Sequence, residues 1–105
     1  MILTTTEKIE GRKIEAVLGL VRGNTIRARH LGRDFLAGMR NIVGGEIKDY
    51  TRMLSDARDQ AIRRMVREAE KLGADAVVCL RFTTSQTMSG AAEILAYGTA
   101  VKLEG

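Results

Sequence analysis

Cysteine and histidine are side chains well suited to binding a transition metal, and this chain has one of each, Cys79 and His30. A zinc site in a protein needs three or four ligands, so one chain alone supplies too few residues of these two types. Equivalent residues from neighbouring copies could complete a site for zinc or another heavy metal at His30 and Cys79. The alternative is that Cys79, between Val78 and Leu80, is an inert buried thiol, a common environment for a free cysteine.

A second candidate for binding is a basic segment that contains no acid before Asp34. Its residues are Arg22, Arg27, Arg29, His30 and Arg33. Such a segment could contact a phosphate or an acidic partner. It could also be a solvent-exposed entry to a helix. Positive charge at a helix N-terminus is unfavourable, however, and this favours a bound anion or a partner's carboxylate there.

The sequence contains none of the common catalytic patterns. Both the P-loop pattern and GxGxxG are missing, so Gly44-Gly45 is assigned to a turn between two helices. No pair of acids is spaced for acid–base chemistry, and no nucleophile, base and orienting group can be assembled. We therefore expect a protein that is not an enzyme and that carries no cofactor other than a possible metal.

The first element that must position these residues is a strand over residues 13–22. Apolar side chains alternate there at period two, which places Leu18 and Leu20 on one face and Val21 on the other. We expect Gly23-Asn24 to end this strand.

Two helical segments follow the first strand. Apolar residues recur at spacings of three and four over 29–43, and again from Glu46 to Leu72. The second helix places Ala57, Ala61 and Met65 on one face and would be about 40 Å long. Gly73 is expected to end it in a left-handed conformation.

Period-two patterns return over residues 75–85 and 92–103, and the turn between them predicts a β-hairpin. The alternation places Val78 and Leu80 on one face, with Val77 and Cys79 on the other. The order of strand, helix, helix, strand, strand predicts an α+β fold with both helices on one face of an antiparallel sheet. Because the strands are apolar on both faces, we expect another copy of the chain to bury the second face.

Length and composition indicate one globular domain, residues 1–105. The single cysteine excludes an internal disulfide, the first residues do not form a signal peptide, and no apolar run approaches the ~20 residues that span a bilayer. We therefore expect a cytoplasmic protein with no membrane partner. Arginine supplies twelve of the seventeen basic residues, but the net charge of +4 is modest and acids are interleaved, which argues against nucleic acid as the partner.

Three blocks are distinctive in combination: RDFLAGMRNIVGG at 33–45, LGADAVV at 72–78 and YGTAV at 97–101. Together with Thr4-Thr5, Gly11, Gly19 and Gly23, they resemble the YbjQ-like family of small bacterial and archaeal proteins over nearly the whole chain. The resemblance implies a dodecin-like subunit, a homopentameric ring and the family's heavy-metal-binding label, with no catalytic residues. Cys79 stands where a small residue is expected, so a metal site common to the family should not depend on it.

These arguments predict a homo-oligomeric scaffold, or a module that holds a small ligand or anion near Arg33, Asp34, Arg40 and Tyr50. The helical pattern places Arg33 and Arg40 two turns apart along one side. The alternative for these residues is structural, with Arg33 paired to Asp34 and Arg40 paired to a neighbour's carboxylate at an interface. The alternative function is heavy-metal binding or metal sensing through His30, Cys79 or carboxylates.

Overall fold

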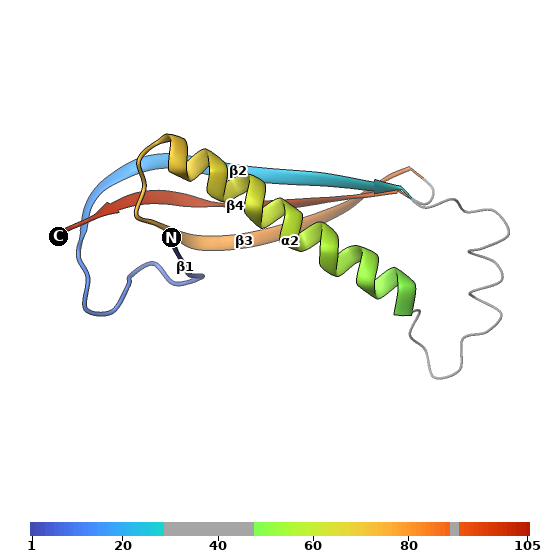
Figure 1. Cartoon of the computed structure of the whole chain (residues 1–105), viewed down its shortest axis with the longest axis horizontal. Coiled ribbons are helices and arrows are strands. Elements are labelled where there is room, and N and C mark those ends of the chain that lie inside the picture. The colour runs from blue at the N-terminus through green and yellow to red at the C-terminus, as the bar shows by residue number, and fades with distance from the viewer. Residues whose placement is uncertain (29–47, 89–90) are drawn as a thin grey trace, which may run out of the picture.

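The computed structural model of the chain describes residues 1–28, 48–88 and 91–105. One long helix lies across one face of a four-stranded sheet (Figure 1). The elements are β1 (Ile2–Leu3), β2 (Ile14–Ala28), α2 (Lys48–Lys71), β3 (Ala76–Met88) and β4 (Ala91–Leu103). This confirms the predicted α+β class and the predicted order of β2, α2, β3 and β4. β1 was not predicted, and the helix predicted over 29–43 lies outside the described residues.

The strands are arranged in the order β1-β3-β4-β2. β4 pairs antiparallel with both β2 and β3, as the hairpin prediction requires. β1 instead pairs parallel to β3, with Ile2 opposite Ala76, so the sheet is mixed and the prediction of an antiparallel sheet is wrong. Two residues are too few to show a periodic pattern. The segment is held by backbone bonds such as the one from the Thr4 N–H to the Val77 carbonyl oxygen, at 3.0 Å.

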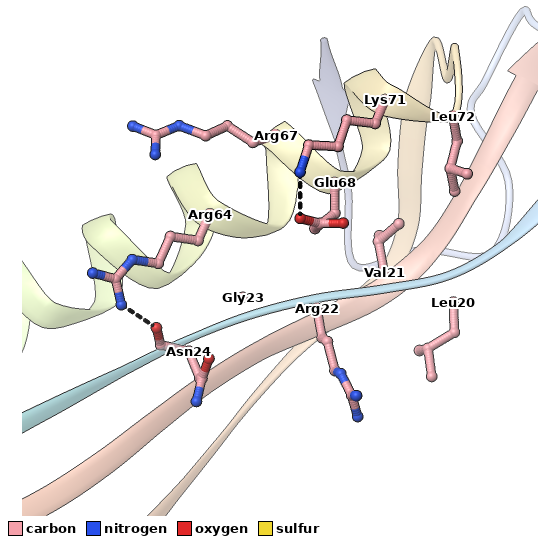
Figure 2. Close-up of a pocket in the computed structure, with 10 residues that line it drawn as sticks. All are labelled: Leu20, Val21, Arg22, Gly23, Asn24, Arg64, Arg67, Glu68, Lys71 and Leu72. Carbon is pink, nitrogen blue, oxygen red and sulfur yellow. Dashed lines mark hydrogen bonds and ion pairs between the residues drawn. The ribbon is translucent and has the colours of Figure 1, made fainter.

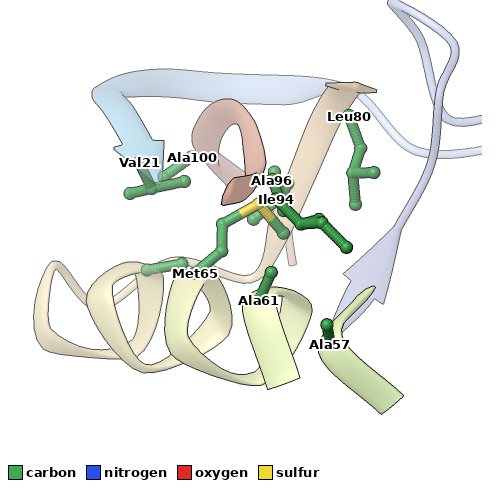
Figure 3. Packing of buried hydrophobic residues seen from close by; sticks show 10 residues of the cluster. Val21, Ala57, Ala61, Met65, Leu80, Ile94, Ala96 and Ala100 are labelled. Carbon is green, nitrogen blue, oxygen red and sulfur yellow. The ribbon is translucent and has the colours of Figure 1, made fainter. Parts of the chain in front are cut away.

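Small side chains allow α2 to lie close to the sheet. Ala57, Ala61, Met65 and Ala69 recur every four residues and are completely buried, as the sequence pattern predicted. Met65 is the large side chain of this row, and Figure 3 shows it pointing from α2 toward Ile94 of β4. Dispersion contacts and the burial of apolar surface therefore hold the two layers together.

The C-terminus of α2 has the geometry of a Schellman motif. The Gly73 N–H donates to the Glu70 carbonyl oxygen at 2.9 Å, and the Ala74 N–H donates to that of Ala69 at 3.1 Å. Gly73 has a φ of 75°, a conformation that costs glycine little. The predicted helix end is confirmed.

The prediction that Gly23-Asn24 ends the strand is wrong, because β2 continues to Ala28. The glycine is needed for packing: a Cβ at this position would collide with the carbonyl oxygen of Ala61 and the amide nitrogen of Met65. Two residues further on, the buried Thr25 hydroxyl donates to the Ala57 carbonyl oxygen at 3.1 Å. Together these contacts hold the middle of β2 against α2.

An irregularity in β2 separates two leucines that the simple alternation placed on one face. The pairing with β4 shifts between Val17 and Gly19, and Gly19 has a φ of 136°. As a result Leu18 packs against the core under α2, whereas Leu20 is 69% exposed. The predicted shared face is therefore wrong, since one extra residue reverses the direction of every side chain beyond it.

β3 contains a second irregularity, between Val78 and Arg81. Cys79 lies in it with a φ of 55°, in the left-handed region that non-glycine residues seldom adopt. Leu80 consequently joins Val77 in the core under α2, and Val78 lies in a separate cluster. The prediction that Val78 and Leu80 share a face is also wrong.

The face of the sheet away from α2 is only partly covered. At one end, Val78, Val101 and Leu103 form a second buried cluster, and Ile9 from the N-terminal segment packs against it. Elsewhere Ile26 and Met88 remain 62% and 67% exposed. Within this chain, therefore, part of the sheet's apolar surface stays in contact with solvent.

Candidate functional site

A groove of about 800 Å³ lies between the C-terminal half of α2 and the middle of β2 (Figure 2). We call it the basic groove. It is lined by Leu20, Val21, Arg22, Gly23, Asn24, Arg64, Arg67, Glu68, Lys71 and Leu72. Its volume is within the range of ~300–1,000 Å³ that is usual for small-molecule sites.

α2 supplies three of the four cations of the basic groove. Arg64, Arg67 and Lys71 are separated by three and four residues, so they lie along one side of the helix. Arg64 Nη1 donates to the Asn24 carbonyl oxygen at 2.6 Å and so connects the helix to β2. Lys71 Nζ lies 3.1 Å from Glu68 Oε1, an exposed ion pair that contributes little to stability.

β2 supplies the fourth cation, Arg22. Figure 2 shows Arg22 and Leu20 projecting from the same side of β2, away from α2. Within the described part of the chain, neither Arg22 nor Arg67 has an ion-pair or hydrogen-bond partner. With Glu68 as its one acid, the groove has a net charge of +3, against +4 for the whole chain. Three of these four cations lie on α2, and the fourth projects from the opposite side of β2.

The lining of the basic groove suits the binding of an anion. Its lining residues include no histidine, cysteine or hydroxyl nucleophile. Guanidinium groups present planar, always charged donor pairs that match the oxygens of carboxylates and phosphates. Leu72 adds apolar surface at the α2 side of the groove, and Leu20 projects from β2 on the side away from α2 (Figure 2).

Most residues of the predicted ligand cluster lie outside the described part of the chain: Arg33, Asp34 and Arg40. Tyr50 is in the first turn of α2, and its side chain is outside the described part as well. The predicted cluster therefore remains a prediction, and the basic groove is a different site.

Of the two predicted metal ligands, Cys79 is described and His30 is not. The Cys79 side chain is half-buried and packs against the cluster of Val78 and Val101 on the face away from α2. Across the described ranges, no three His, Cys, Asp or Glu residues gather closely enough to hold a metal ion. The described residues by themselves do not form a metal centre.

Asp75 is the acid that the fold affects most clearly. The Leu103 backbone N–H donates to Asp75 Oδ2 at 2.9 Å, and Lys102 Nζ lies 3.6 Å from Oδ1. The hydrogen bond from Leu103, followed by the charge of Lys102, holds the pKa of Asp75 below its usual 3.8, although partial desolvation opposes this shift. These bonds join the entry of β3 to the end of β4, so the role of Asp75 is structural.

The sequence analysis did not identify the basic groove. The spacing of Arg64, Arg67 and Lys71 was visible as one face of a helix, but such a face is usually only solvated. The decisive feature is the position of this face beside the backbone of β2 at Asn24, forty residues away from Arg64 in sequence, and only the packing of α2 on β2 produces it.

Comparison with known proteins supplies a family for this fold. A family profile described as "putative heavy-metal-binding", that of the YbjQ-like proteins, matches residues 1–104. The chain belongs to the YbjQ-like family. This confirms the resemblance found from the sequence blocks.

Relatives in the family align over nearly their full length. A UPF0145 protein of Archaeoglobus fulgidus is 65% identical over 103 residues, which are 98% of this chain and 95% of the relative. The UPF0145 protein DET1617 of Dehalococcoides mccartyi is 61% identical over 104 residues, covering 99% and 100%. A UPF0145 protein of Thermotoga maritima is 59% identical, covering 99% and 98%. None of these names refers to an enzymatic activity.

A crystal structure supports the fold at greater evolutionary distance. A protein of unknown function from Pediococcus pentosaceus, assigned to the DUF74 family, superposes with a TM-score of 0.66 at 18% identity. The superposition covers 99% of this chain and 98% of that one.

In the described ranges, no helix combines the length and the apolar character required to cross a membrane.

Proposed function

We propose that this protein is a homo-oligomeric binding module, a closed ring of identical subunits that holds a small ligand. The observation that carries the proposal is the open edge of β2. β2 pairs with β4 on one side and has no described strand on the other. This 15-residue edge strand exposes Val17, Leu20 and Ile26. Soluble monomers usually shield such an edge, because it readily pairs with another chain.

A second open edge lies on the opposite side of the sheet. β1 pairs only with Ala76 and Val77, and no described strand continues along the outer edge of β3 from Arg81 to Met88. Because the two open edges differ, pairing β2 of one subunit with β3 of the next would be a head-to-tail contact. Repeated head-to-tail contacts form a closed ring when the rotation between neighbouring subunits brings the last subunit back to the first. We take five subunits and a dodecin-like arrangement from the resemblance to the YbjQ-like family.

Apolar burial supplies the driving force in this proposal. Ile26 and Met88 lie on or near the two open edges and would leave water on assembly, as would Leu20. Each Å² of apolar surface removed from water contributes about 25 cal/mol. Arg22 and Arg27 also lie on β2 and would favour a register that pairs them with acids or leaves them hydrated.

Size-exclusion chromatography with multi-angle light scattering tests the assembly. We expect a mass about five times the 11.5 kDa of one chain, unchanged on moderate dilution. A stable monomer of 11.5 kDa would overturn the proposal, and an oligomer of another size would overturn the pentamer alone.

For the ligand we keep the cluster of Arg33, Asp34, Arg40 and Tyr50 as one proposed site. Its structural alternative is a set of ion pairs at the subunit interface. Arg40→Gln distinguishes the two roles: loss of oligomer mass supports the interface, and an unchanged mass supports a binding role. We further propose a cytoplasmic location and no catalysis, because the chain has one cysteine and no assembled nucleophile and base.

The family description favours heavy-metal binding or sensing as a second candidate. In a ring, His30 and Cys79 of several subunits could together supply the three or four ligands a metal needs. Elemental analysis of protein purified without added metal tests this, with a double variant of Cys79→Ala and His30→Ala as the comparison. Stoichiometric metal that is lost in the double variant supports the candidate. Parent protein without stoichiometric metal ends it.

A further inference from the structure

We propose that the basic groove binds a small organic phosphate. The proposal rests on the binding role proposed above and names both a ligand class and a site for it. The site is the groove between α2 and β2, and none of its residues belongs to the cluster predicted from the sequence.

The charge of the groove selects an anion. Arg67 has no partner among the described residues, so its guanidinium group is available to a ligand, whereas Arg22 projects from β2 away from α2 (Figure 2). Arg64 is already oriented by its bond to the Asn24 carbonyl oxygen and keeps further N–H donors free. Arg64, Arg67 and Lys71 along one side of α2, with Glu68 as the one acid among them, suit a ligand with more than one negative charge.

The shape and the apolar lining indicate that the anion carries an organic part. Leu72 is 48% exposed at the groove, an unfavourable situation for leucine in the isolated chain. A volume of about 800 Å³ is far more than a single inorganic phosphate requires. A ligand with a phosphate at one end and an apolar group or ring at the other would use both kinds of lining.

The location of the groove relates it to the proposed assembly. Leu20 to Asn24 belong to β2, whose outer edge is open. A neighbouring subunit paired with this edge would close the open side of the groove and exclude water from the ligand. Lower local dielectric would then strengthen each contact between arginine and phosphate.

Isothermal titration calorimetry with two probes, adenosine diphosphate and inorganic pyrophosphate, tests the proposal without added magnesium. We expect both probes to bind, with the diphosphate tighter because its adenosine contacts the apolar lining. Arg67→Gln should weaken both probes by about tenfold, and Arg22→Gln should weaken them less, because its guanidinium group lies on the side of β2 away from α2. Arg63→Gln is the matched control, since Arg63 is an exposed arginine of α2 outside the groove, and it should leave both affinities unchanged.

A further variant examines the organic part of the ligand. Leu72→Asn should weaken adenosine diphosphate and leave pyrophosphate unaffected. Absence of binding by the parent protein at millimolar probe overturns the proposal, and so does an equal loss in the Arg63 and Arg67 variants. Much tighter binding of a single-stranded oligonucleotide, reduced by all three arginine variants, would also overturn it in favour of nucleic acid.

Light scattering on the same samples separates this proposal from the assembly proposal. An oligomer that binds neither probe overturns the phosphate site alone. A monomer that binds both probes, with the expected losses, overturns the ring and leaves the phosphate site supported.

Discussion

Gly23 of β2 lies directly against the backbone of Ala61 in α2, so closely that a Cβ on Gly23 would collide with the Ala61 carbonyl oxygen. This contact joins the most extensively packed pair of helix and strand in the fold. It depends on two small residues, because α2 can approach β2 only where neither element carries a bulky side chain. The same approach brings Arg64 within bonding distance of the Asn24 carbonyl oxygen, so the basic groove exists because of it.

We predict that Gly23→Ala lowers the free energy of unfolding by about 2 kcal/mol, since rigid backbone atoms on α2 cannot move aside for the methyl group. Chemical denaturation at a fixed protein concentration measures the change. Gly98→Ala should cost less, because the nearest atom to its Cβ is the side-chain Cγ1 of Val77, at 2.6 Å. Gly105→Ala, with nothing within 4 Å, is the neutral control. A loss for Gly23→Ala no larger than for Gly105→Ala would contradict the close contact.

Ile26→Lys should prevent assembly through the edge of β2. Ile26 is 62% exposed on that edge, and a lysine within an edge strand opposes pairing because its charge must remain hydrated. We expect the mass measured by light scattering to fall toward 11.5 kDa. Ser55→Lys adds the same charge on the exposed side of α2 and should leave the oligomer intact. If Ser55→Lys dissociates the oligomer equally, the added charge itself, and not its position on the open edge of β2, is responsible.

The regular elements were predictable because their periods are unbroken. The alternation over 92–103 predicted β4, in which Ile94 and Ala96 lie under α2 and Val101 and Leu103 lie in the second cluster, and the spacing in α2 correctly placed Ala57, Ala61 and Met65 on its buried side. Both patterns depend only on local backbone geometry. The predicted faces of Leu20 and Leu80 are wrong because the strand pairing is irregular next to each residue. The position of such an irregularity depends on the pairing with β4 and not on the local pattern.

The candidate site was less predictable than the fold for a related reason. A groove depends on which helix face meets which strand, and no local pattern relates Arg22 to Arg67. The sequence emphasised residues 30–40, where charge is dense, but dense charge in sequence does not specify what lies beside it in space. Leu72 illustrates the same difficulty: as the last apolar residue of the helical pattern it was expected in the core, and it is 48% exposed beside the groove.

Asp75 should make the protein more stable at neutral than at strongly acid pH. Its pKa is lowered in the folded chain, first by the Leu103 N–H, so its contribution is present above 3.8 and is lost as pH falls through the lower folded value. We expect the melting temperature of the parent to exceed that of Asp75→Asn near neutral pH, with the difference shrinking as the pH falls below 3.8.

Lys102→Gln tests which group causes the shift. Because the backbone bond is the larger cause, this variant should keep most of the difference between parent and Asp75→Asn. Carbon NMR titration of the Asp75 carboxyl group gives its pKa directly. A value at or above 3.8 in the folded protein would contradict the assignment.

Cys79 offers a test of the irregularity in β3 that is independent of metal binding. Its φ of 55° costs a residue with a Cβ about 1–2 kcal/mol, and a β-branched residue still more. We therefore expect Cys79→Gly to be more stable than Cys79→Ala, and Cys79→Val to be the least stable of the three. A regular strand would give the opposite order, because valine favours strands and glycine weakens them. Chemical denaturation of the three variants decides the order, and the highest stability for valine would mean that Cys79 lies in an ordinary extended strand.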